Sequence, residues 1–322
     1  MKKGVCYFFL LFLWIIVFVC TVKAQSSRYV SQYDNLRKYL GKDHIETLDS
    51  ARMKIIYSLR YIPDSTNPKN VLRDKKVLLI GDKIKHFYSA YVRQADSALT
   101  ADFNKGKKSA PIKRAPDVLG EGYDIYIGYP DAGNQMVLEY ITDLSTYGYK
   151  ENIEFPKWTI DDSAYVVLGY PCQKATGRFR GRDWIVWFST AIPLNAGPWK
   201  LGGLPGLILK ASDSRGHYVF ECIGFEQLKK KKEPIIWKKG AYHYTKCTRE
   251  EYRKAQNRFY DDHVNVLLSM GWNINVVDDN GNSLEHINTP DKSFEERHIS
   301  WGTTVNAADR YKKLPYNPIE LE

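Results

Sequence analysis

Gly197-Pro-Trp-Lys-Leu-Gly-Gly-Leu-Pro-Gly-Leu-Ile-Leu-Lys210 is the stretch around which the rest of the sequence is most coherently organised. It holds four glycines and two prolines in fourteen residues and runs directly into an apolar strand. Glycine reaches backbone conformations that other residues avoid, and proline fixes φ and has no N–H to donate. Leu204-Pro-Gly-Leu207 predicts a type II turn, which requires a positive φ at Gly206. The stretch therefore predicts a shaped, ordered loop in which Trp199 packs against the rest of the chain.

This loop allows two interpretations, one functional and one structural. A phosphate-binding loop is excluded, because its glycine motif would have to open a helix and an apolar strand follows here. Shaped loops often carry function, and a binding surface on this one would consist of Trp199, Lys200, Leu204, Pro205 and Gly206, with Trp187 on the preceding strand. The structural interpretation is a buried turn joining two strands, in which the glycines and prolines serve only the backbone.

Patterns of period two predict strands on both sides of the loop. Met53 to Tyr61 alternates apolar and polar residues, and Gly81-Asp82 separates two short apolar runs as the turn of a hairpin. Further strands are predicted at 123–129, 136–143, 158–160, 165–169, 172–179, 183–189, 207–211 and 218–225. Strands at this short spacing, with turns and no helices between them, indicate an antiparallel meander. Because a twisted sheet of many strands tends to curl, we expect a curved sheet or half-barrel.

One long helix and an irregular tail are predicted towards the end of the sequence. Thr248 and Glu251 form a capping box, and an apolar stripe continues from there to Met270. From about residue 273 the sequence is mostly polar, so this tail must be pinned against the body or disordered. No Ser/Gly-rich linker or repeat divides residues 25–322, which we interpret as a single domain. The predicted fold class is mainly β with minor α, with the long helix packed on the sheet.

Residues 1–24 have the pattern of a cleaved secretory signal peptide. Two lysines precede an apolar run from Cys6 to Val19, and Ala24 offers a cleavage site before Gln25. The apolar run is shorter than the roughly 20 residues of a membrane-spanning helix, so we do not expect the cleaved chain to span a membrane. Cleavage would leave 298 of the 322 residues, exported to the periplasm or cell envelope.

The sequence assigns no catalytic residue, no metal ligand and no cofactor. It contains no nucleophile elbow, no His-Glu-x-x-His helix, no Cys-x-x-Cys pair and no calcium-binding loop. Beyond the signal, Cys172, Cys222 and Cys247 are interpreted as small apolar residues, and Cys222–Cys247 is the pairing to test first. The basic run Lys229–Lys232 is interpreted as a solvated hairpin end rather than a patch for an anionic membrane surface. Nucleic-acid binding fits an exported protein poorly, despite the net charge of +10.

Several segments resemble the GLPGLI family, envelope proteins of Bacteroidota without an established biochemical function. The hexapeptide Gly203-Leu-Pro-Gly-Leu-Ile208 is similar to the signature that gives the family its name. The resemblance extends to Gly169–Thr176, Trp187–Pro193, Gly197–Trp199 and Asn317–Leu321, and so covers most of the chain after the signal. It implies an envelope location and this fold class, and it assigns no catalytic residue.

Two hypotheses about function follow. The first is a non-catalytic accessory or carrier protein that binds an apolar, lipid-like ligand or an outer-membrane receptor through a cavity on the concave face of the sheet. The second is a hydrolase of unfamiliar type, using Asp, Glu and His residues clustered in a pocket. A mainly apolar or aromatic cavity favours the first hypothesis, and ionisable residues gathered in one deep pocket favour the second.

Overall fold

The computed structural model describes residues 45–94, 122–142, 145–228, 233–238, 244–269, 272–287, 301–306, 313–314 and 316–322. The chain divides into two compact units, at a boundary that the sequence did not indicate. The larger unit comprises Ile45–Asp261 and Lys313–Glu322, and the smaller comprises Met1–His44 and Asp262–Lys312. The predicted signal peptide and the basic run at 229–232 lie outside the described residues. None of the described helices is long and apolar enough to cross a membrane.

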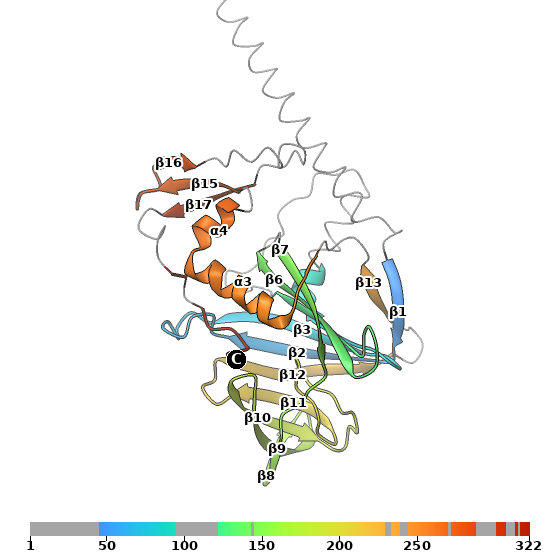
Figure 1. Cartoon of the computed structure of the whole chain (residues 1–322). Helices are drawn as coiled ribbons and strands as arrows, with labels where there is room; N and C mark the ends of the chain where they lie inside the picture. The colour runs from blue at the N-terminus through green and yellow to red at the C-terminus, as the bar shows by residue number, and fades with distance from the viewer. Residues whose placement is uncertain are drawn as a thin grey trace, which may run out of the picture. The chain divides into compact units, whose positions relative to one another are not determined.

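Twelve strands of the larger unit form one open sheet (Figure 1). They are β2 (Met53–Tyr61), β3 (Leu72–Ile80), β4 (Lys85–Ser89), β5 (Tyr123–Ile127), β6 (Asn134–Thr142), β7 (Ser145–Asn152), β8 (Thr159–Val167), β9 (Tyr170–Phe179), β10 (Arg182–Ser189), β11 (Leu207–Asp213), β12 (Tyr218–Gln227) and β14 (Tyr244–Lys246). Their order across the sheet is β14-β7-β6-β5-β4-β3-β2-β12-β11-β10-β9-β8. Neighbouring strands pair antiparallel except β14 and β7, which are parallel. The prediction of a mainly β fold with a mostly antiparallel sheet is confirmed.

Most strands lie where the alternating patterns predicted them, and two differences are informative. β2 begins and ends as predicted, and β3 and β4 form the hairpin around Gly81-Asp82. The two short strands expected at 158–160 and 165–169 are one strand, β8, which continues through a register shift between Asp161 and Ala164. β7 was not predicted, because its sequence is polar except for two tyrosines.

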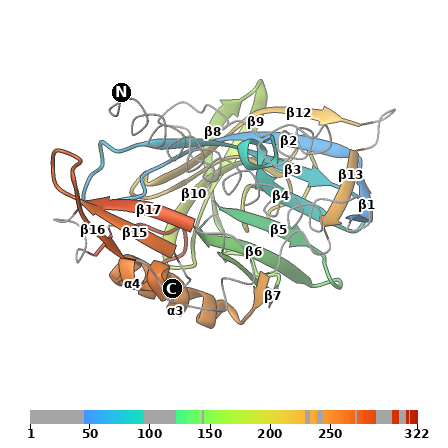
Figure 2. The same cartoon turned by 90° about the horizontal axis from the view of Figure 1, so that it is seen from above.

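Alternation along the strands divides the side chains between two faces of the sheet. On one face, Tyr57 and Phe220 belong to the main hydrophobic core. On the other face, Leu79 and Tyr126 pack with Trp237 in a smaller core, beneath a ribbon of two strands. These strands are β1 (Ile45–Ala51) and β13 (Glu233–Lys238), which lie side by side and pair antiparallel (Figure 2).

The first half of the predicted helix forms as the sequence indicated. α3 (Arg249–Asp261) begins at the predicted capping box. The Thr248 backbone N–H donates to the Glu251 carboxylate at 2.7 Å, and the Glu251 N–H donates to the Thr248 hydroxyl at 3.1 Å. α3 packs on the main-core face of the sheet, where Tyr252 lies 5.9 Å from Tyr149 of β7 between ring centroids.

The prediction of one helix from Thr248 to Met270 is wrong, because α3 ends at Asp261. The carbonyl of Tyr260 accepts the N–H of Leu314 at 2.7 Å, in place of an N–H from a further turn of the same helix. A second helix, α4 (His263–Ser269), begins in the smaller unit.

The smaller unit also holds three strands in the region expected to be irregular. These are β15 (Trp272–Val277), β16 (Ser283–Ile287) and β17 (Trp301–Asn306), in the order β16-β15-β17. Ile274 and Val276 of β15 are buried, which is the alternation of a strand. The prediction of an irregular tail from about residue 273 is therefore wrong for these strands. It holds for 316–322, a segment without strand or helix that is pinned against the larger unit.

The loop from Gly197 to Lys210 is ordered and mostly buried, as predicted. Trp199 is 1% exposed, and its ring centroid lies 5.6 Å from that of Trp184. The expected type II turn is wrong, because Gly206 does not adopt a positive φ. Glycine is needed there for a different reason, since a Cβ at this position would lie 2.1 Å from the carbonyl oxygen of Ser189.

We expect Gly206→Ala to lower the free energy of unfolding by about 1–3 kcal/mol, the usual cost of overpacking. The added methyl group would displace the backbone of Ser189, which cannot move as a flexible side chain would. Gly224→Ala is the matched control, because a Cβ at Gly224 meets nothing within 4 Å. Urea unfolding followed by tryptophan fluorescence measures both, and equal stabilities would contradict the close-packing explanation.

The three described cysteines form no disulfide, and Cys222 and Cys247, the pairing to test first, are both free thiols. The Cys222 thiol instead donates to the carbonyl of Gly224 at 3.6 Å, and the Cys247 thiol donates to that of Gly148 at 3.8 Å. Burial raises the pKa of Cys222 to about 11, which keeps it a protonated, weakly nucleophilic thiol.

Candidate functional site: a tyrosine-lined pocket

A pocket of about 350 Å³ opens in the larger unit between the main-core face of the sheet, α3 and the segment 316–320. Eight of its nineteen lining residues are tyrosines: Tyr61, Tyr123, Tyr140, Tyr149, Tyr218, Tyr252, Tyr260 and Tyr316. We call it the tyrosine pocket. Its volume is at the lower end of the roughly 300–1,000 Å³ usual for small-molecule sites.

The tyrosines are brought together by the sheet register and by α3. Tyr61 of β2 lies opposite Tyr218 of β12, and their rings stack at 5.8 Å with 20° between the planes. Tyr260 at the end of α3 stacks on Tyr316 at 3.8 Å. Stacked pairs of this kind hold the rings in place, so the walls present fixed aromatic surfaces.

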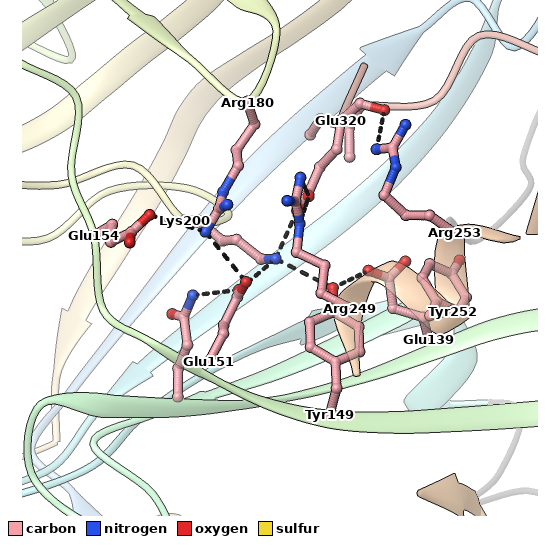
Figure 3. A network of polar contacts seen from close by, with 12 residues as sticks. Glu139, Tyr149, Glu151, Glu154, Arg180, Lys200, Arg249, Tyr252, Arg253 and Glu320 are labelled. Carbon is pink, nitrogen blue, oxygen red and sulfur yellow. Dashed lines mark hydrogen bonds and ion pairs between the residues drawn. The ribbon is translucent and has the colours of Figure 1, made fainter. Parts of the chain in front are cut away.

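A buried lysine organises the polar residues beside the pocket (Figure 3). Lys200 is 3% exposed, and its ammonium group donates to Glu151 at 2.6 Å, to Glu320 at 2.6 Å and to the Tyr149 hydroxyl at 3.3 Å. These three contacts use all three N–H donors of the ammonium group. The Tyr149 hydroxyl in turn donates to Glu139 at 2.7 Å, so a continuous chain of contacts joins Lys200 to a pocket-lining acid.

The ion pairs in this network keep their charges although they are buried. Burial alone would lower the pKa of Lys200, but the carboxylates of Glu320, Glu151 and Glu139 raise it above its usual range. Burial alone would raise the pKa of Glu320, yet Lys200 and Arg249 hold it at about 2. Arg249 lies 2.6 Å from the second carboxylate oxygen of Glu320. Lys200, Arg249 and Glu320 are therefore charged at neutral pH.

Glu139 differs from the other acids of the network. It is half-buried, lines the pocket and lies on β6, on the same face of the strand as the buried Val137. Burial raises its pKa to about 7, although Lys200 acts to lower it, and the charge of Glu320 adds to the increase. A carboxyl group with this pKa exchanges a proton near neutral pH, and it can donate as well as accept a hydrogen bond.

The segment 316–320 closes one side of the pocket and is held by three arginines. Arg182 is 3% exposed and donates to Asp213 at 2.8 Å, to the Asn317 side chain at 2.8 Å and to the carbonyl of Ile319 at 2.9 Å. Arg253 of α3 donates to the carbonyl of Glu320 at 2.9 Å, and Arg249 pairs with its carboxylate. These contacts hold Asn317, Ile319 and Glu320, which line the pocket, against β10 and α3.

We expect Glu139→Gln to stabilise the protein above pH 7 and to reduce the fall in stability between pH 5 and 8. The folded pKa of about 7 exceeds the usual 4.5, so the folded state binds more protons than the unfolded state between these values. The wild-type free energy of unfolding therefore falls as pH rises through this window, by at most about 3 kcal/mol. The Gln side chain does not ionise and removes this contribution.

Urea unfolding at pH 5, 6, 7 and 8 measures the difference between wild type and variant. Glu250→Gln is the control, because Lys254 lowers the pKa of this exposed acid and its titration lies below the window. Parallel pH dependences for wild type and Glu139→Gln would show that Glu139 is ionised throughout.

None of the six residues proposed from the sequence as a binding surface lines the tyrosine pocket. Trp199, Lys200, Leu204 and Gly206 are buried, and Pro205 is exposed. Trp187 is half-buried on β10, where its ring lies 5.1 Å from that of Tyr165 on β8. Lys200 contacts two residues that line the pocket, Glu320 at 2.6 Å and the hydroxyl of Tyr149 at 3.3 Å.

Sequence reasoning missed Glu139, Tyr149, Tyr252 and Glu320. For Glu139 a signal was present, because it shares the inward face of β6 with Val137 and a charge at an inward strand position is unusual. For Glu320 no local signal exists, since its partners Lys200 and Arg249 are distant in the sequence.

Among the described residues, no cluster of three or more His, Cys, Asp or Glu could hold a metal ion. None of the lining residues of the tyrosine pocket is a histidine. His86 is fully buried under the β1–β13 ribbon, stacked on Tyr126 and 3.8 Å from Asp124, on the other face of the sheet. The pocket combines aromatic surfaces, fixed ion pairs and one acid that exchanges a proton near pH 7.

Comparisons with known proteins add little. No family model matches the sequence, and no curated protein matches it. Among solved structures, two crystal forms of PNGF-II match with a TM-score of 0.41, at 13% and 12% identity. The matches cover 64% and 63% of this chain and 32% of the PNGF-II chain, so this chain spans about a third of the length of that protein. A TM-score this low supports no argument about fold or function.

Proposed function

We propose that this chain is an exported envelope protein of the GLPGLI type that binds a small molecule in the tyrosine pocket and does not catalyse a reaction. The observation that carries the proposal is the pocket itself, a cavity of about 350 Å³ with eight tyrosines in its wall. Tyrosine contributes a large apolar surface at low entropic cost and a hydroxyl for hydrogen bonds, which suits a ligand with apolar and polar parts. The pattern of residues 1–24 supports export.

The residues around the pocket are arranged for binding more than for chemistry. Glu320 is held in ion pairs with Lys200 and Arg249, which leaves Glu139 as the lining acid outside such a pair. Hydrolysis usually needs a second acid, base or nucleophile within reach of the first, and no His is among the described residues that line the pocket. A hydrolase is the alternative, and it depends on Glu139 as the proton-transferring group. An outer-membrane receptor as partner stays a proposal without a surface assigned to it.

Native mass spectrometry of the protein purified from its own envelope tests the proposal. We expect a bound mass in the wild type, on a chain that begins at Gln25. Gln256→Trp on α3 places a bulky ring in the pocket wall and should abolish the bound mass. Asn257→Trp is the matched control, because Asn257 is the next residue on α3, is exposed and does not line the pocket. A bound mass that survives Gln256→Trp and a clean wild-type mass would each argue against the pocket as the binding site.

A further inference from the structure

Most of the charges beside the tyrosine pocket are already paired within the protein. Lys200 pairs with Glu151 and Glu320, Arg249 pairs with Glu320, and Arg180 pairs with Glu151 and Glu154 (Figure 3). A ligand with a net charge would have to compete with these pairs, and burying a charge without a partner is unfavourable. The pairing therefore favours a neutral ligand.

The aromatic walls also argue against an organic cation. Three of the pocket tyrosines already have a protein cation over the ring: Lys76 lies 4.0 Å from Tyr123, Arg182 lies 4.8 Å from Tyr218, and Lys200 lies 5.4 Å from Tyr149. A second cation against the same rings would be repelled by the first. In an aromatic cage that binds a quaternary ammonium group, the ring faces are free to receive the ligand cation.

A purely apolar ligand fits the wall poorly. Glu139, Arg253 and Gln256 line the pocket together with the phenol rings, and each carries polar atoms. Covering them with a hydrocarbon chain would remove their water without replacing its hydrogen bonds, which is unfavourable. The ligand therefore has to supply donors and acceptors as well as an apolar face.

We propose that the tyrosine pocket binds a neutral, polyhydroxylated ring, that is, a saccharide unit. This inference rests on the proposed binding function and adds the class of ligand. The C–H faces of a sugar ring pack on the tyrosine rings, and its hydroxyl groups bond to Glu139, Arg253 and Gln256. Glu139 can accept from one hydroxyl or donate to another, because its pKa of about 7 makes both protonation states accessible.

Saturation-transfer-difference NMR with the full-length mature protein tests this ligand class. The probes are the methyl glycosides of glucose, galactose, mannose and N-acetylglucosamine. Tetramethylammonium and a short-chain fatty acid represent the cationic and apolar classes. We expect transfer to at least one glycoside and to neither of the other probes. Binding to an array of immobilised glycans is then measured with and without the free glycoside as competitor. Binding to the array that the glycoside competes away indicates a glycan end as the ligand, and no binding to the array indicates a free sugar.

Variants place the binding in the pocket. Glu139→Ala and Gln256→Trp should each weaken binding of the responsive glycoside at least tenfold. Glu250→Ala, an exposed acid on α3 that does not line the pocket, is the control and should leave it unchanged. Binding that persists in both pocket variants overturns the proposal.

The remaining outcomes separate this inference from the proposed function. Transfer to the fatty acid or to tetramethylammonium, lost in Gln256→Trp and absent for every glycoside, rejects the saccharide and keeps a binding pocket. No transfer to any probe, together with a clean native mass, rejects both.

Discussion

Lys200→Met is expected to lower the free energy of unfolding by about 3–5 kcal/mol, the cost of breaking a buried ion pair from one side. The ammonium group of Lys200 lies 2.6 Å from Glu151 and 2.6 Å from Glu320 and is almost completely shielded from water. Methionine keeps the length and apolar stem of the side chain but removes the charge. Glu151 and Glu320 then lose the cation that they share and keep only Arg180 and Arg249 as partners. Urea unfolding at pH 7 measures the result.

A second substitution separates the charge effect from a packing effect. In the double variant Lys200→Met with Glu320→Gln, one of the two carboxylates that faced the lost ammonium group is also removed, so part of the lost stability should return. Lys254→Met is the control, because this exposed lysine on α3 pairs with the equally exposed Glu250 and should leave stability nearly unchanged. If Lys200→Met unfolds at the same urea concentration as the wild type, the network does not stabilise the fold.

The sequence predicted those parts of the fold that depend on local patterns. β2 alternates Ile55, Tyr57 and Leu59 with polar residues, and its bounds match the prediction. The start of α3 was also predictable, because a capping box is a contact between residues three apart, Thr248 and Glu251. In both cases the interaction that defines the element lies within it.

Elements stabilised by distant partners were missed or misjudged. Among the described strands, β1 pairs only with β13. Most strands of the larger sheet lie between these two in the sequence. The long helix ends at Asp261 because Leu314, far along the chain, supplies a donor to Tyr260. A periodic pattern carries no information about such contacts.

The candidate site was hidden for the same reason. The tyrosine pocket collects side chains from β2, β3, β5, β6, β7, β12, α3 and the segment 316–320, and these elements are spread over most of the larger unit in the sequence. The number of tyrosines in the sequence suggested amphipathic aromatic surfaces, but not where they meet. The conspicuous loop around Trp199 proved to be buried, and only Lys200 reaches the polar network beside the pocket.

The loop itself supplies the second large effect. Trp199→Ala is expected to cost about 3–5 kcal/mol, because a buried Trp that packs on Trp184 and Phe179 leaves a large cavity when truncated. Trp199 also has a φ of 55°, in the left-handed region that costs an L-residue roughly 1–2 kcal/mol. Glycine does not incur this cost, so Trp199→Gly should be at least as stable as Trp199→Ala, the reverse of the usual order.

Thermal and urea unfolding of the two variants measure both effects. Trp199→Phe, which keeps an aromatic ring in the site, should lie between the wild type and Trp199→Ala. Stability of Trp199→Ala equal to that of the wild type would mean that the ring is dispensable for packing, and it would support the interpretation of this loop as a binding surface. A Trp199→Gly variant clearly less stable than Trp199→Ala would show that the left-handed backbone relaxes once the ring is gone. The order of the three variants therefore separates the contribution of the indole ring from that of the backbone that positions Lys200 next to it.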